Sequence, residues 1–419
     1  MKKLFLPVIL VLGVLFLFAG CASTSSASQK STEVKKESKG FPERVNWLEV
    51  PSLKDSYSDI FENIGVAVNE RDLQGGDTLE GLVYHFSSIT MENEFKPQFM
   101  FNWQKPNSNG TFTSSKGVTI EVPTNVPSFT RMDKMMNIAK SFGLRMRGHV
   151  LVWHSQTEAS FFRENYNASG ALVDKETMDA RQEWYIKTIL EHVKEWEDKY
   201  NDGKRLIYCW DVVNEAVSDN ATVNAYLRTN SDWYAIFKSD EFIVNAFRYA
   251  NKYAPADVQL AYNDYSCTSP AKTGGILKVI DAIQAAEKDD FLPARIDVIG
   301  MQSHVGLNNP QTSAFDIAIR KFLEKNIDVQ ITELDVNDTG MGSDLILRAR
   351  YKALFQTFKK YQKVDGGHGI SGVTFWGIND ERSWISKNGT MFPLLFTRDS
   401  NGYLTKPAFF GCIEAASEE

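Results

Sequence analysis

The stretches Tyr208-Cys-Trp-Asp-Val-Val-Asn-Glu215-Ala and Asp328-Val-Gln-Ile-Thr-Glu333-Leu-Asp-Val are two short apolar runs that each end in a glutamate. Both are typical of buried parallel strands, whose last residues reach the mouth of a sheet. A single glutamate after a strand more often caps a helix or pairs with a basic group. Two carboxylates that converge at one edge of a sheet can instead work together as a proton donor and an anion.

Four further strand-like runs also end in polar or aromatic residues, and this pattern favours the second interpretation. They are Ser88-Ile-Thr-Met-Glu92-Asn93, Arg147-Gly-His149-Val-Leu-Val-Trp153-His154, Ile299-Gly-Met-Gln302-Ser-His304 and Val373-Thr-Phe-Trp376. A neutral sugar offers hydroxyl groups and apolar ring faces, which polar side chains and tryptophans can bind. The sequence therefore predicts a sugar site with a carboxylate pair, the arrangement that glycoside hydrolysis requires.

The composition limits the kind of protein and the kind of partner. The chain has 419 residues, of which 43% are hydrophobic, so it can form one large domain or two ordinary ones. Its net charge is -7 and it has no long basic run, which argues against a nucleic-acid partner and for a neutral or weakly charged one.

Residues 1–20 are predicted to be a lipoprotein signal peptide. Met1-Lys-Lys is basic, residues 4–18 form an apolar run that is short for a membrane span, and Ala19-Gly20-Cys21 resembles a bacterial lipobox. We therefore expect a lipid on Cys21. The usual Leu three residues before the cysteine is absent, so an ordinary secretory signal or an uncleaved anchor is the alternative.

Residues 21–42 are predicted to be a flexible tether, because this segment is rich in Ser, Thr, Lys and Glu and has no apolar cluster to offset the entropy of ordering. The catalytic domain is then expected over residues 43–415. These features predict an exported protein that is anchored by lipid to a bacterial membrane. Where the source has two membranes, Ala22 replaces the Asp that commonly retains lipoproteins at the inner one, which favours the outer membrane or the cell surface.

From about Phe41 onward, short β-rich runs alternate with longer helical patterns, which is typical of βα units on a parallel sheet. The expected strands are 64–68, 88–91, 145–152, 206–213, 259–262, 298–302, 329–332 and 372–375. The expected helices are 132–142, 185–196, 242–253, 273–286, 315–325 and 346–360. Eight strands close a barrel, and the sequence has no internal repeat, so the predicted fold class is α/β, a single-domain (β/α)8 TIM barrel.

A barrel of this kind carries its catalytic groups at the carboxyl ends of the strands. Alternation along a strand places Glu333 and Asp335 on a shared face. His149 and His154 do not share one, and none of the six histidines forms a His-x-His pair, which weakens a metal site. We therefore expect no metal and no cofactor.

These residues lie in motifs that together resemble those of the glycoside hydrolase family 10 endo-β-1,4-xylanases, from about residue 63 to residue 409. The motifs are E-N-x-F-K at 92–96, G-H-V-L-V-W-H-S-Q at 148–156, W-D-V-V-N-E-A at 210–216, N-D-Y at 263–265, G-M-Q-S-H-V at 300–305, I-T-E-L-D-V at 331–336 and T-F-W-G-I-N-D at 374–380, with Trp384. The resemblance implies that Glu215 is the general acid/base and Glu333 the nucleophile. A retaining mechanism of this kind needs the two carboxyl groups only about 5–5.5 Å apart.

The resemblance also implies roles for the residues around the two carboxylates. His304 and Asp335 are similar to residues that hydrogen-bond around the nucleophile, and Asn214 to the residue that contacts the sugar 2-hydroxyl. Alone, His304 would be interpreted as a core histidine, but its motif favours the functional role.

Substrate binding is implied for a larger group of residues. The polar members are Glu92, Asn93, Lys96, His149, Gln302 and Tyr265, and the aromatic walls are Trp153, Trp376 and Trp384. In the family, the last two tryptophans crowd the position of a hexose hydroxymethyl group, so we expect a preference for xylose over glucose. The alternative, that the tryptophans only pack the core, fits Trp153 best and Trp384 least, because Trp384 lies in a polar loop.

Three departures from the family pattern affect these expectations. Phe95 and Pro97 stand where the family usually has Met and Trp, and residues 157–162 lack the Pro and the Trp of the run T-P-x-W-F-F. Since that loop flanks the leaving-group side in relatives, the expected effect is on binding of the leaving chain. The polar excursion 99–127 is expected to add distal contacts.

The sequence thus predicts a retaining endo-β-1,4-xylanase that acts on β-1,4-xylan and xylo-oligosaccharides, as a monomer attached to the membrane through Cys21. A related barrel β-glycanase that acts on glucan is one alternative, and turnover of xylan against cello-oligosaccharides separates the two. A non-catalytic lipoprotein that captures oligosaccharides is another. The carboxylate pair argues against it, because a pure binder has no need of two such groups.

Overall fold

The computed structural model describes residues 44–418 except 102–103, 339–343 and 387–390. The described residues belong to one compact unit. The predicted signal peptide, tether and lipidated Cys21 lie outside the described residues, and so these three remain predictions. Within the described part of the chain, no helix combines the length and the hydropathy that crossing a bilayer requires.

The centre of the fold is a closed barrel of eight parallel strands, as the sequence predicts. The strands of this sheet are β1 (Asn63–Val68), β2 (Ser88–Met91), β5 (Arg145–Gly148), β6 (Val152–Trp153), β7 (Ile207–Asn214), β8 (Gln259–Asp264), β9 (Val298–Met301), β10 (His304–Gly306), β11 (Asp328–Asn337) and β12 (Ile370–Phe375). The order around the barrel is β1-β2-β5-β7-β8-β9-β11-β12, and pairing of β12 with β1 closes it. The short strands β6 and β10 extend it beside β7 and β11.

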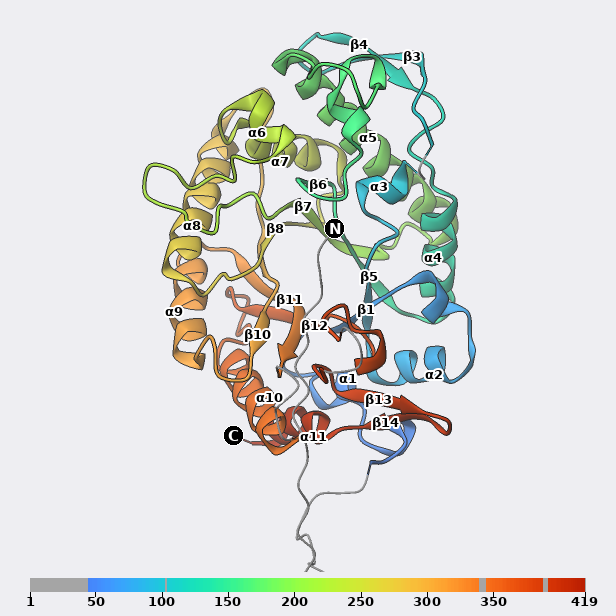
Figure 1. Ribbon diagram of the computed structural model, residues 1–419, viewed down its shortest axis with the longest axis vertical. Helices are drawn as coiled ribbons and strands as arrows, with labels where there is room; N and C mark the ends of the chain where they lie inside the picture. The colour runs from blue at the N-terminus through green and yellow to red at the C-terminus, as the bar shows by residue number, and fades with distance from the viewer. Residues whose placement is uncertain (1–43, 102–103, 339–343, 387–390, 419) are drawn as a thin grey trace, which may run out of the picture. The chain divides into compact units, whose positions relative to one another are not determined.

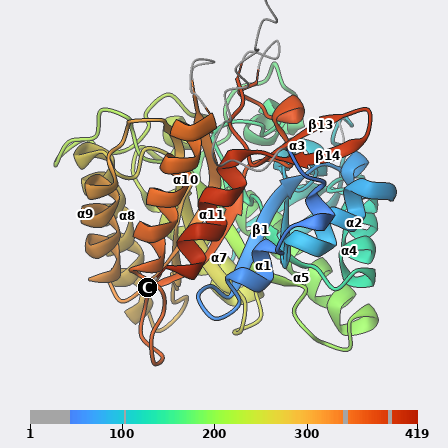
Figure 2. The same ribbon diagram turned by 90° about the horizontal axis from the view of Figure 1, so that it is seen from below.

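Helices surround the strands (Figure 1). They are α1 (Leu53–Ser56), α2 (Gly76–His85), α3 (Pro97–Met100), α4 (Thr130–Ser141), α5 (Lys175–Tyr200), α6 (Asp232–Phe237), α7 (Glu241–Tyr253), α8 (Pro270–Ala285), α9 (Thr312–Leu323), α10 (Asp344–Lys359) and α11 (Pro407–Ser417). Each of the six helices expected from the sequence is present. Figure 2 shows α10 and α11 side by side on the outside of the barrel.

Helix α5 illustrates how the sequence determines these elements. Asp174 caps its first turn by accepting a hydrogen bond from the Thr177 N–H at 2.7 Å. Along the helix, Ile186, Ile189 and Val193 recur on one face and are buried. The apolar face therefore packs onto the barrel, as the sequence predicts.

Two parts of the sheet structure differ from the expectation. The third strand is not continuous over 145–152, because the chain leaves the sheet after β5 and rejoins β7 as β6. The polar excursion 99–127 contains a two-stranded hairpin, β3 (Ser108–Thr113) and β4 (Thr119–Pro123). A second hairpin, β13 (Phe396–Asp399) and β14 (Gly402–Thr405), precedes α11.

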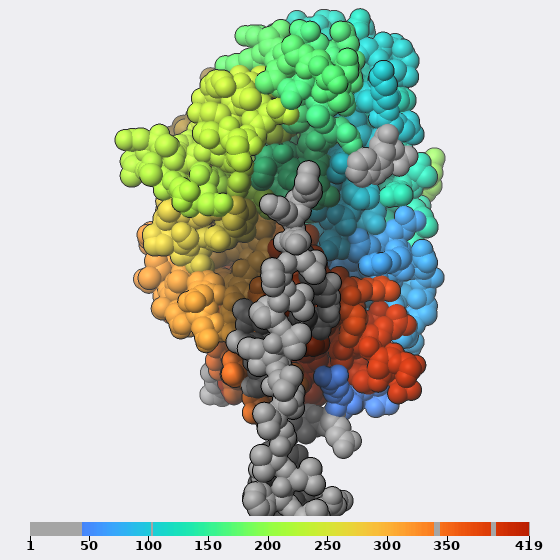
Figure 3. Space-filling model, in the orientation of Figure 1, coloured from blue at the N-terminus to red at the C-terminus, as the bar shows by residue number. Residues whose placement is uncertain are grey.

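The beginning and the end of the described chain meet beside the barrel. The backbone N–H of Thr405 donates to the carbonyl of Val45 at 2.8 Å, and Asn46 forms a bridge with Leu404. In Figure 3 the last segment, in red, lies against the first, in blue. This contact fixes the end of the chain after the eighth strand.

A buried ion pair crosses the interior of the barrel below the predicted site. Arg147 and Asp211 are 1% and 0% exposed, and the guanidinium donates two hydrogen bonds to the carboxylate, one of them at 2.6 Å. Arg147 also donates to Gln330 at 2.9 Å, and Asp211 holds the Nδ1 atom of His149 at 2.8 Å. The pair therefore links the core to one of the predicted substrate-binding residues.

We expect Asp211→Ala to lower the free energy of unfolding by about 3–5 kcal/mol, because it leaves the Arg147 charge buried without its partner. Urea denaturation of the wild type and the variant measures this loss. The control is Asp198→Ala, which removes an exposed carboxylate that pairs with Lys194 and Arg205 and should change stability little. Equal effects of the two substitutions would contradict the role assigned to the buried pair.

Candidate active site

A cleft of about 590 Å³ opens at the carboxyl ends of the barrel strands. It is lined by Glu92, Asn93, Lys96, His149, Trp153, Gln156, Asn214, Glu215, Tyr265, Ser266, Gln302, His304, Glu333, Trp376 and Trp384. All the catalytic and substrate-binding residues predicted from the sequence are in this set except Asp335. That residue lies directly behind the wall, where it contacts His304 and Trp384.

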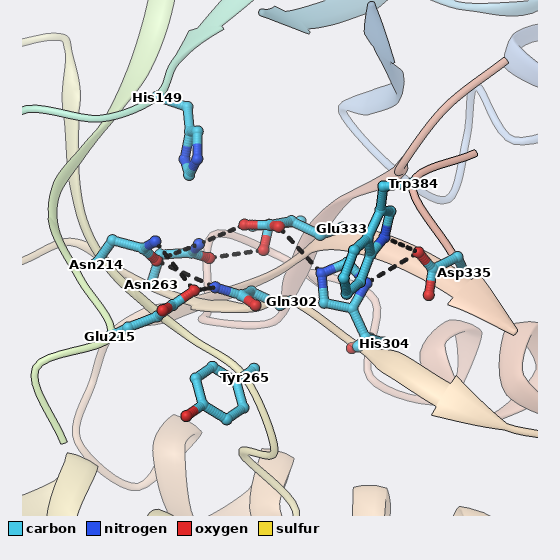
Figure 4. Close-up of polar contacts among 12 residues, drawn as sticks. His149, Asn214, Glu215, Asn263, Tyr265, Gln302, His304, Glu333, Asp335 and Trp384 are labelled. Carbon is cyan, nitrogen blue, oxygen red and sulfur yellow. Dashed lines mark hydrogen bonds and ion pairs between the residues drawn. The ribbon is translucent and has the colours of Figure 1, made fainter. Parts of the chain in front are cut away.

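Glu333 lies on β11 and is 5% exposed. Its Oε1 accepts a hydrogen bond from the Asn263 amide at 2.8 Å, and its Oε2 lies 3.2 Å from Nε2 of His304 (Figure 4). Burial by itself would raise the pKa of this carboxyl, but the His304 contact, the charge of His149 and the Asn263 hydrogen bond lower it to about 2. Glu333 is therefore an anion at neutral pH.

His304 lies between two carboxylates. Strand β10 pairs with β11 so that His304 is directly opposite Asp335, and Nδ1 of His304 is 3.0 Å from the Asp335 carboxylate. Burial alone would lower the pKa of His304, but the charges of Asp335 and Glu333 raise it to about 10. The imidazolium thus has a negative group on each side. Trp384 donates from its indole to the same Asp335 oxygen at 2.8 Å, which completes the cluster.

Glu215 follows β7 at the other side of the cleft and is half-buried. The Oε1 atom of Glu215 accepts one hydrogen bond from Gln302 at 2.8 Å and another from Asn214 at 3.3 Å. Its Oε2 atom accepts a hydrogen bond from the Trp153 indole at 3.0 Å. Both carboxyl oxygens are therefore oriented by neutral donors. This contrasts with Glu333, whose neighbour His304 is a cation.

The backbone of Glu215 adopts a left-handed conformation, with φ of 57°. Such a conformation is uncommon for residues other than glycine and persists where surrounding contacts determine it. The Glu215 N–H donates to the carbonyl of Asn263 at 2.9 Å, and the Glu215 carbonyl accepts from Arg228 at 3.0 Å. The turn directs the side chain into the cleft.

Neutral amides connect the two carboxylates. The Asn263 side chain donates to Glu333 and also to the Asn214 oxygen at 2.9 Å. Gln302 donates to the same Asn214 oxygen at 3.2 Å as well as to Glu215. Figure 4 shows this continuous chain of hydrogen bonds from one glutamate to the other. It fixes the relative positions of the two groups without adding charge.

Polar residues that follow β2 form one end of the cleft. The Lys96 ammonium donates to Gln156 at 2.9 Å and lies 5.0 Å from the centre of the Trp153 ring. Glu92 accepts a hydrogen bond from Asn69, and its burial raises the pKa of its carboxyl. Burial likewise lowers the pKa of Lys96. These polar groups can donate and accept hydrogen bonds with the hydroxyl groups of a ligand.

Two tryptophans form the wall near Glu333. Trp376, after β12, is 6% exposed and packs edge-on against His149 at 5.4 Å between ring centres. Trp384 is 50% exposed and packs edge-on against His304 at 5.0 Å. The exposed face of Trp384 is available to a ligand, as its position in a polar loop predicts.

On the opposite side of Glu215, Tyr265 and Ser266 line the cleft. The Tyr265 hydroxyl donates to Asp219 at 2.5 Å and accepts from Arg228 at 2.7 Å. The loop 157–162, which differs from the family pattern, contributes no residue to the lining of the described cleft, because Phe161 and Phe162 are buried against Trp233.

No described residue of the excursion 99–127 lines the described cleft, and the distal contacts expected of this segment stay a prediction. Its hairpin reaches α5 instead, where the Ser115 N–H donates to Glu183 at 2.8 Å.

Sequence reasoning missed several functional residues. Asn263, Asp211 and Gln156 lie inside the motifs quoted above, yet none was assigned a role. The signal for Asn263 is its place at the end of the fifth barrel strand, the same criterion that identified Glu215. Asn69, which orients Glu92 and accepts from Asn93 at 3.1 Å, lies in a loop outside every motif and gave no signal.

The donor set does not resemble a metal centre. Among the residues that the structure describes, no group of three or more His, Cys, Asp or Glu side chains could hold a metal ion. The cleft instead combines a buried carboxylate anion with a second carboxyl group oriented by neutral donors. Such a pair can carry out covalent catalysis together with proton transfer.

Comparison with known proteins agrees with this chemistry. The sequence profile of glycosyl hydrolase family 10 matches residues 52–415. The bifunctional endo-1,4-beta-xylanase XylA of Ruminococcus flavefaciens is 34% identical over 358 residues, which are 85% of this chain and 33% of that protein. A beta-1,4-xylanase of Dictyoglomus thermophilum is 31% identical over 397 residues, which are 91% of this chain and 94% of that protein.

A solved structure shows the same similarity. It contains the CBM22-1 and GH10 modules of endo-1,4-beta-D-xylanase 10B from Clostridium thermocellum in complex with xylohexaose. The identity is 31% and the TM-score 0.71, with 87% of this chain and 67% of that chain covered. The present chain thus spans only part of several relatives, and just 33% of the Ruminococcus protein.

The charge of His304 gives a pH-dependent contribution to stability. Its ordinary pKa is 6.5 and its pKa in the folded protein is about 10, so the protonated ring stabilises the fold fully below about pH 6.5. This stabilisation is lost as the pH rises through 10. We therefore expect the difference in free energy of unfolding between wild type and His304→Gln to be largest near pH 6 and to shrink towards pH 10.

Urea denaturation at several pH values measures this difference. His85→Gln is the matched control, because burial lowers the pKa of His85 to about 4 and its ring is neutral over the whole range. The loss in free energy of unfolding caused by His85→Gln should therefore not vary between pH 6 and pH 10. If the loss in free energy of unfolding caused by His304→Gln is also the same at every pH, His304 is not a cation in the folded protein.

Proposed function

The chain belongs to glycosyl hydrolase family 10, and from this premise we propose that it is a retaining endo-β-1,4-xylanase. The observation that carries the proposal is the pairing in one cleft of Glu333, held as an anion, with Glu215, held by neutral donors. A retaining glycosidase needs one carboxylate that attacks the sugar and one carboxyl group that exchanges protons.

In the first step of the proposed reaction, Glu333 attacks the anomeric carbon of a xylosyl unit. Glu215 gives its proton to the glycosidic oxygen, so that the bond to the leaving chain breaks and a covalent glycosyl-enzyme forms. In the second step, Glu215 removes a proton from water, whose oxygen attacks the anomeric carbon and releases Glu333. Two inversions at the same carbon retain the β configuration.

The surroundings of Glu333 support its role as nucleophile. A nucleophilic carboxylate must be ionised before the sugar arrives, and His304 with Asn263 provides that stabilisation. Asp335 in turn stabilises the His304 cation, so the support extends to a second carboxylate. Asn214 lies between the two glutamates, which fits its expected contact with the sugar 2-hydroxyl.

The choice of xylan rests on the relatives and on the chemistry of the cleft. The relatives compared above are named as xylanases, and one was solved with xylohexaose. The amides, the carboxyl group of Glu92 and the exposed face of Trp384 suit a neutral polysaccharide. Faster turnover of xylan than of mixed-linkage glucan or cello-oligosaccharides would support the assignment, and the reverse order would favour a glucanase.

We also infer that the enzyme is exported and attached by lipid on Cys21 to a bacterial membrane, with the outer membrane or the cell surface favoured. The support is the sequence alone, namely a basic start, the apolar run 4–18 and the small residues before Cys21. The tether 21–42 would let the barrel reach an insoluble substrate. The monomeric state remains a prediction.

We expect Glu333→Ala to abolish turnover of both xylan and aryl xylosides, because no covalent intermediate can form. Added azide or formate should partly restore cleavage of an activated aryl xyloside, with a product of inverted configuration, since the small anion occupies the space of the carboxylate. Proton NMR of the first product identifies the anomer. Activity close to that of the wild type would remove Glu333 from the mechanism.

We expect Cys21→Ser to release the protein from membrane fractions without changing the turnover of xylan. The substitution removes the sulfur that would carry the lipid and lies outside the catalytic domain. Fractionation, lipid labelling and a xylanase assay measure the two properties separately. Cys209→Ser, at a buried cysteine, is the control that should not alter fractionation. A Cys21→Ser protein that stays on the membrane would exclude the lipid anchor.

A further inference from the structure

The backbone that follows Glu215 is held by a single phenol. The N–H groups of Ala216 and Val217 both donate to the hydroxyl oxygen of Tyr262, at 3.0 and 3.1 Å. All three residues are buried, and Tyr262 is 0% exposed. Two consecutive amides on one acceptor fix the direction of the chain immediately after Glu215, where φ is 57°.

The orientation of the Tyr262 hydroxyl is fixed by a buried ion pair. A phenol has one proton, and Tyr262 donates it to Asp264 at 2.7 Å, which leaves its lone pairs to the two amides. Asp264 also accepts from the Lys272 ammonium at 2.6 Å and from the Tyr265 N–H at 2.9 Å. Lys272 is 1% exposed and donates to the Val217 carbonyl at 2.9 Å, so it returns to the same turn.

Strand β8 therefore serves both glutamates through alternate residues. Side chains alternate along a strand, so Tyr262 and Asp264 lie on one side and Asn263 on the other. Asn263 donates to Glu333, while Tyr262 holds the turn of Glu215. None of the three belongs to the described lining of the cleft.

A second contact holds the same turn from the other direction. The Arg228 backbone N–H donates to the Ala216 carbonyl at 2.8 Å, and its side chain donates to the Glu215 carbonyl at 3.0 Å. The guanidinium also donates to the Tyr265 hydroxyl at 2.7 Å. The backbone N–H and carbonyl groups of both Glu215 and Ala216 are thus hydrogen-bonded.

We propose that Tyr262, oriented by Asp264 and Lys272, is a positioning residue that keeps Glu215 where it can protonate the leaving oxygen, and that Arg228 acts with it. The inference rests on the proposed role of Glu215 as the acid/base. Without the phenol, two buried amides lose their acceptor and the left-handed turn loses its constraint. A shift of the carboxyl group by about 1 Å is enough to cost about 100-fold in rate.

The test is Tyr262→Phe, which removes only the hydroxyl group. The matched control is Tyr249→Phe, because Tyr249 is also 0% exposed and donates to an aspartate, Asp179, at 2.9 Å, away from the cleft. The quantity to compare is kcat/KM, which reports the first chemical step, for xylohexaose and for an aryl xylobioside with a good leaving group. The second substrate hardly needs a proton in that step.

For Tyr262→Phe we expect kcat/KM to fall about 10- to 100-fold on xylohexaose and by less than about threefold on the aryl xylobioside. Release of the aryl alcohol should show a burst, because breakdown of the intermediate needs Glu215 as a base. Azide should accelerate the slow phase, since this anion needs no base. Tyr249→Phe should resemble the wild type on both substrates.

Two further variants separate the possible failures. Glu215→Ala should show the same contrast between substrates in a larger form, and if it shows none, the proposed function itself fails. Arg228→Lys keeps the charge but loses the planar donor group. If Tyr262→Phe does not fold, the contrast between the two substrates in Arg228→Lys tests whether the turn is held in position. Equal losses on both substrates in Tyr262→Phe or Arg228→Lys, or none, would overturn the positioning role while leaving that of Glu215 intact.

Discussion

The buried negative charge of Glu333 is the constraint on which the rest of the site depends. Burial favours the protonated form of a carboxyl group, so an anion at this position needs compensation from its surroundings. The His304 cation, which lies between Glu333 and Asp335, supplies this compensation, and the neutral amide of Asn263 adds a hydrogen bond to Glu333. Strand β10 supplies His304 directly opposite Asp335, and this register sets the spacing of the row.

Closure of the barrel brings the second carboxyl group to the same place. Glu215 follows β7 and Glu333 lies on β11, and these two strands are separated around the barrel by β8 and β9. The ends of these two intervening strands supply Asn263 and Gln302, the amides that connect the glutamates through Asn214. The chain of amides is therefore a consequence of strand order. Alternation along β8 then places Tyr262 on the other side of that strand from Asn263.

Much of this was predictable from the sequence, for physical reasons. Parallel strands that are buried on both faces give continuous apolar runs, and their polar ends meet at one mouth, so the barrel and the residues at its strand ends were predictable. Lys96, Tyr265 and Trp384 were expected in the cleft only because their motifs resemble those of the family. The hairpin of β3 and β4 was missed because its residues are largely polar and mostly only every second one is removed from solvent. The support of Glu215 was missed because periodicity does not show which polar atoms meet. Arg228 lies in the loop between β7 and α6, and Lys272 lies on α8.

The central claim is that Glu333 forms a covalent bond to the sugar, and trapping that bond tests it most directly. A 2-deoxy-2-fluoro-xylobioside with a good leaving group slows both steps through its fluorine and restores the first through its leaving group, so the intermediate accumulates. Mass spectrometry of the digested enzyme should then show one fluoroxylobiosyl group on the peptide that contains Glu333, and none on the Glu333→Gln variant. Leaving-group release without a trapped enzyme, or a sugar bound to Glu215 or another residue, would contradict the account.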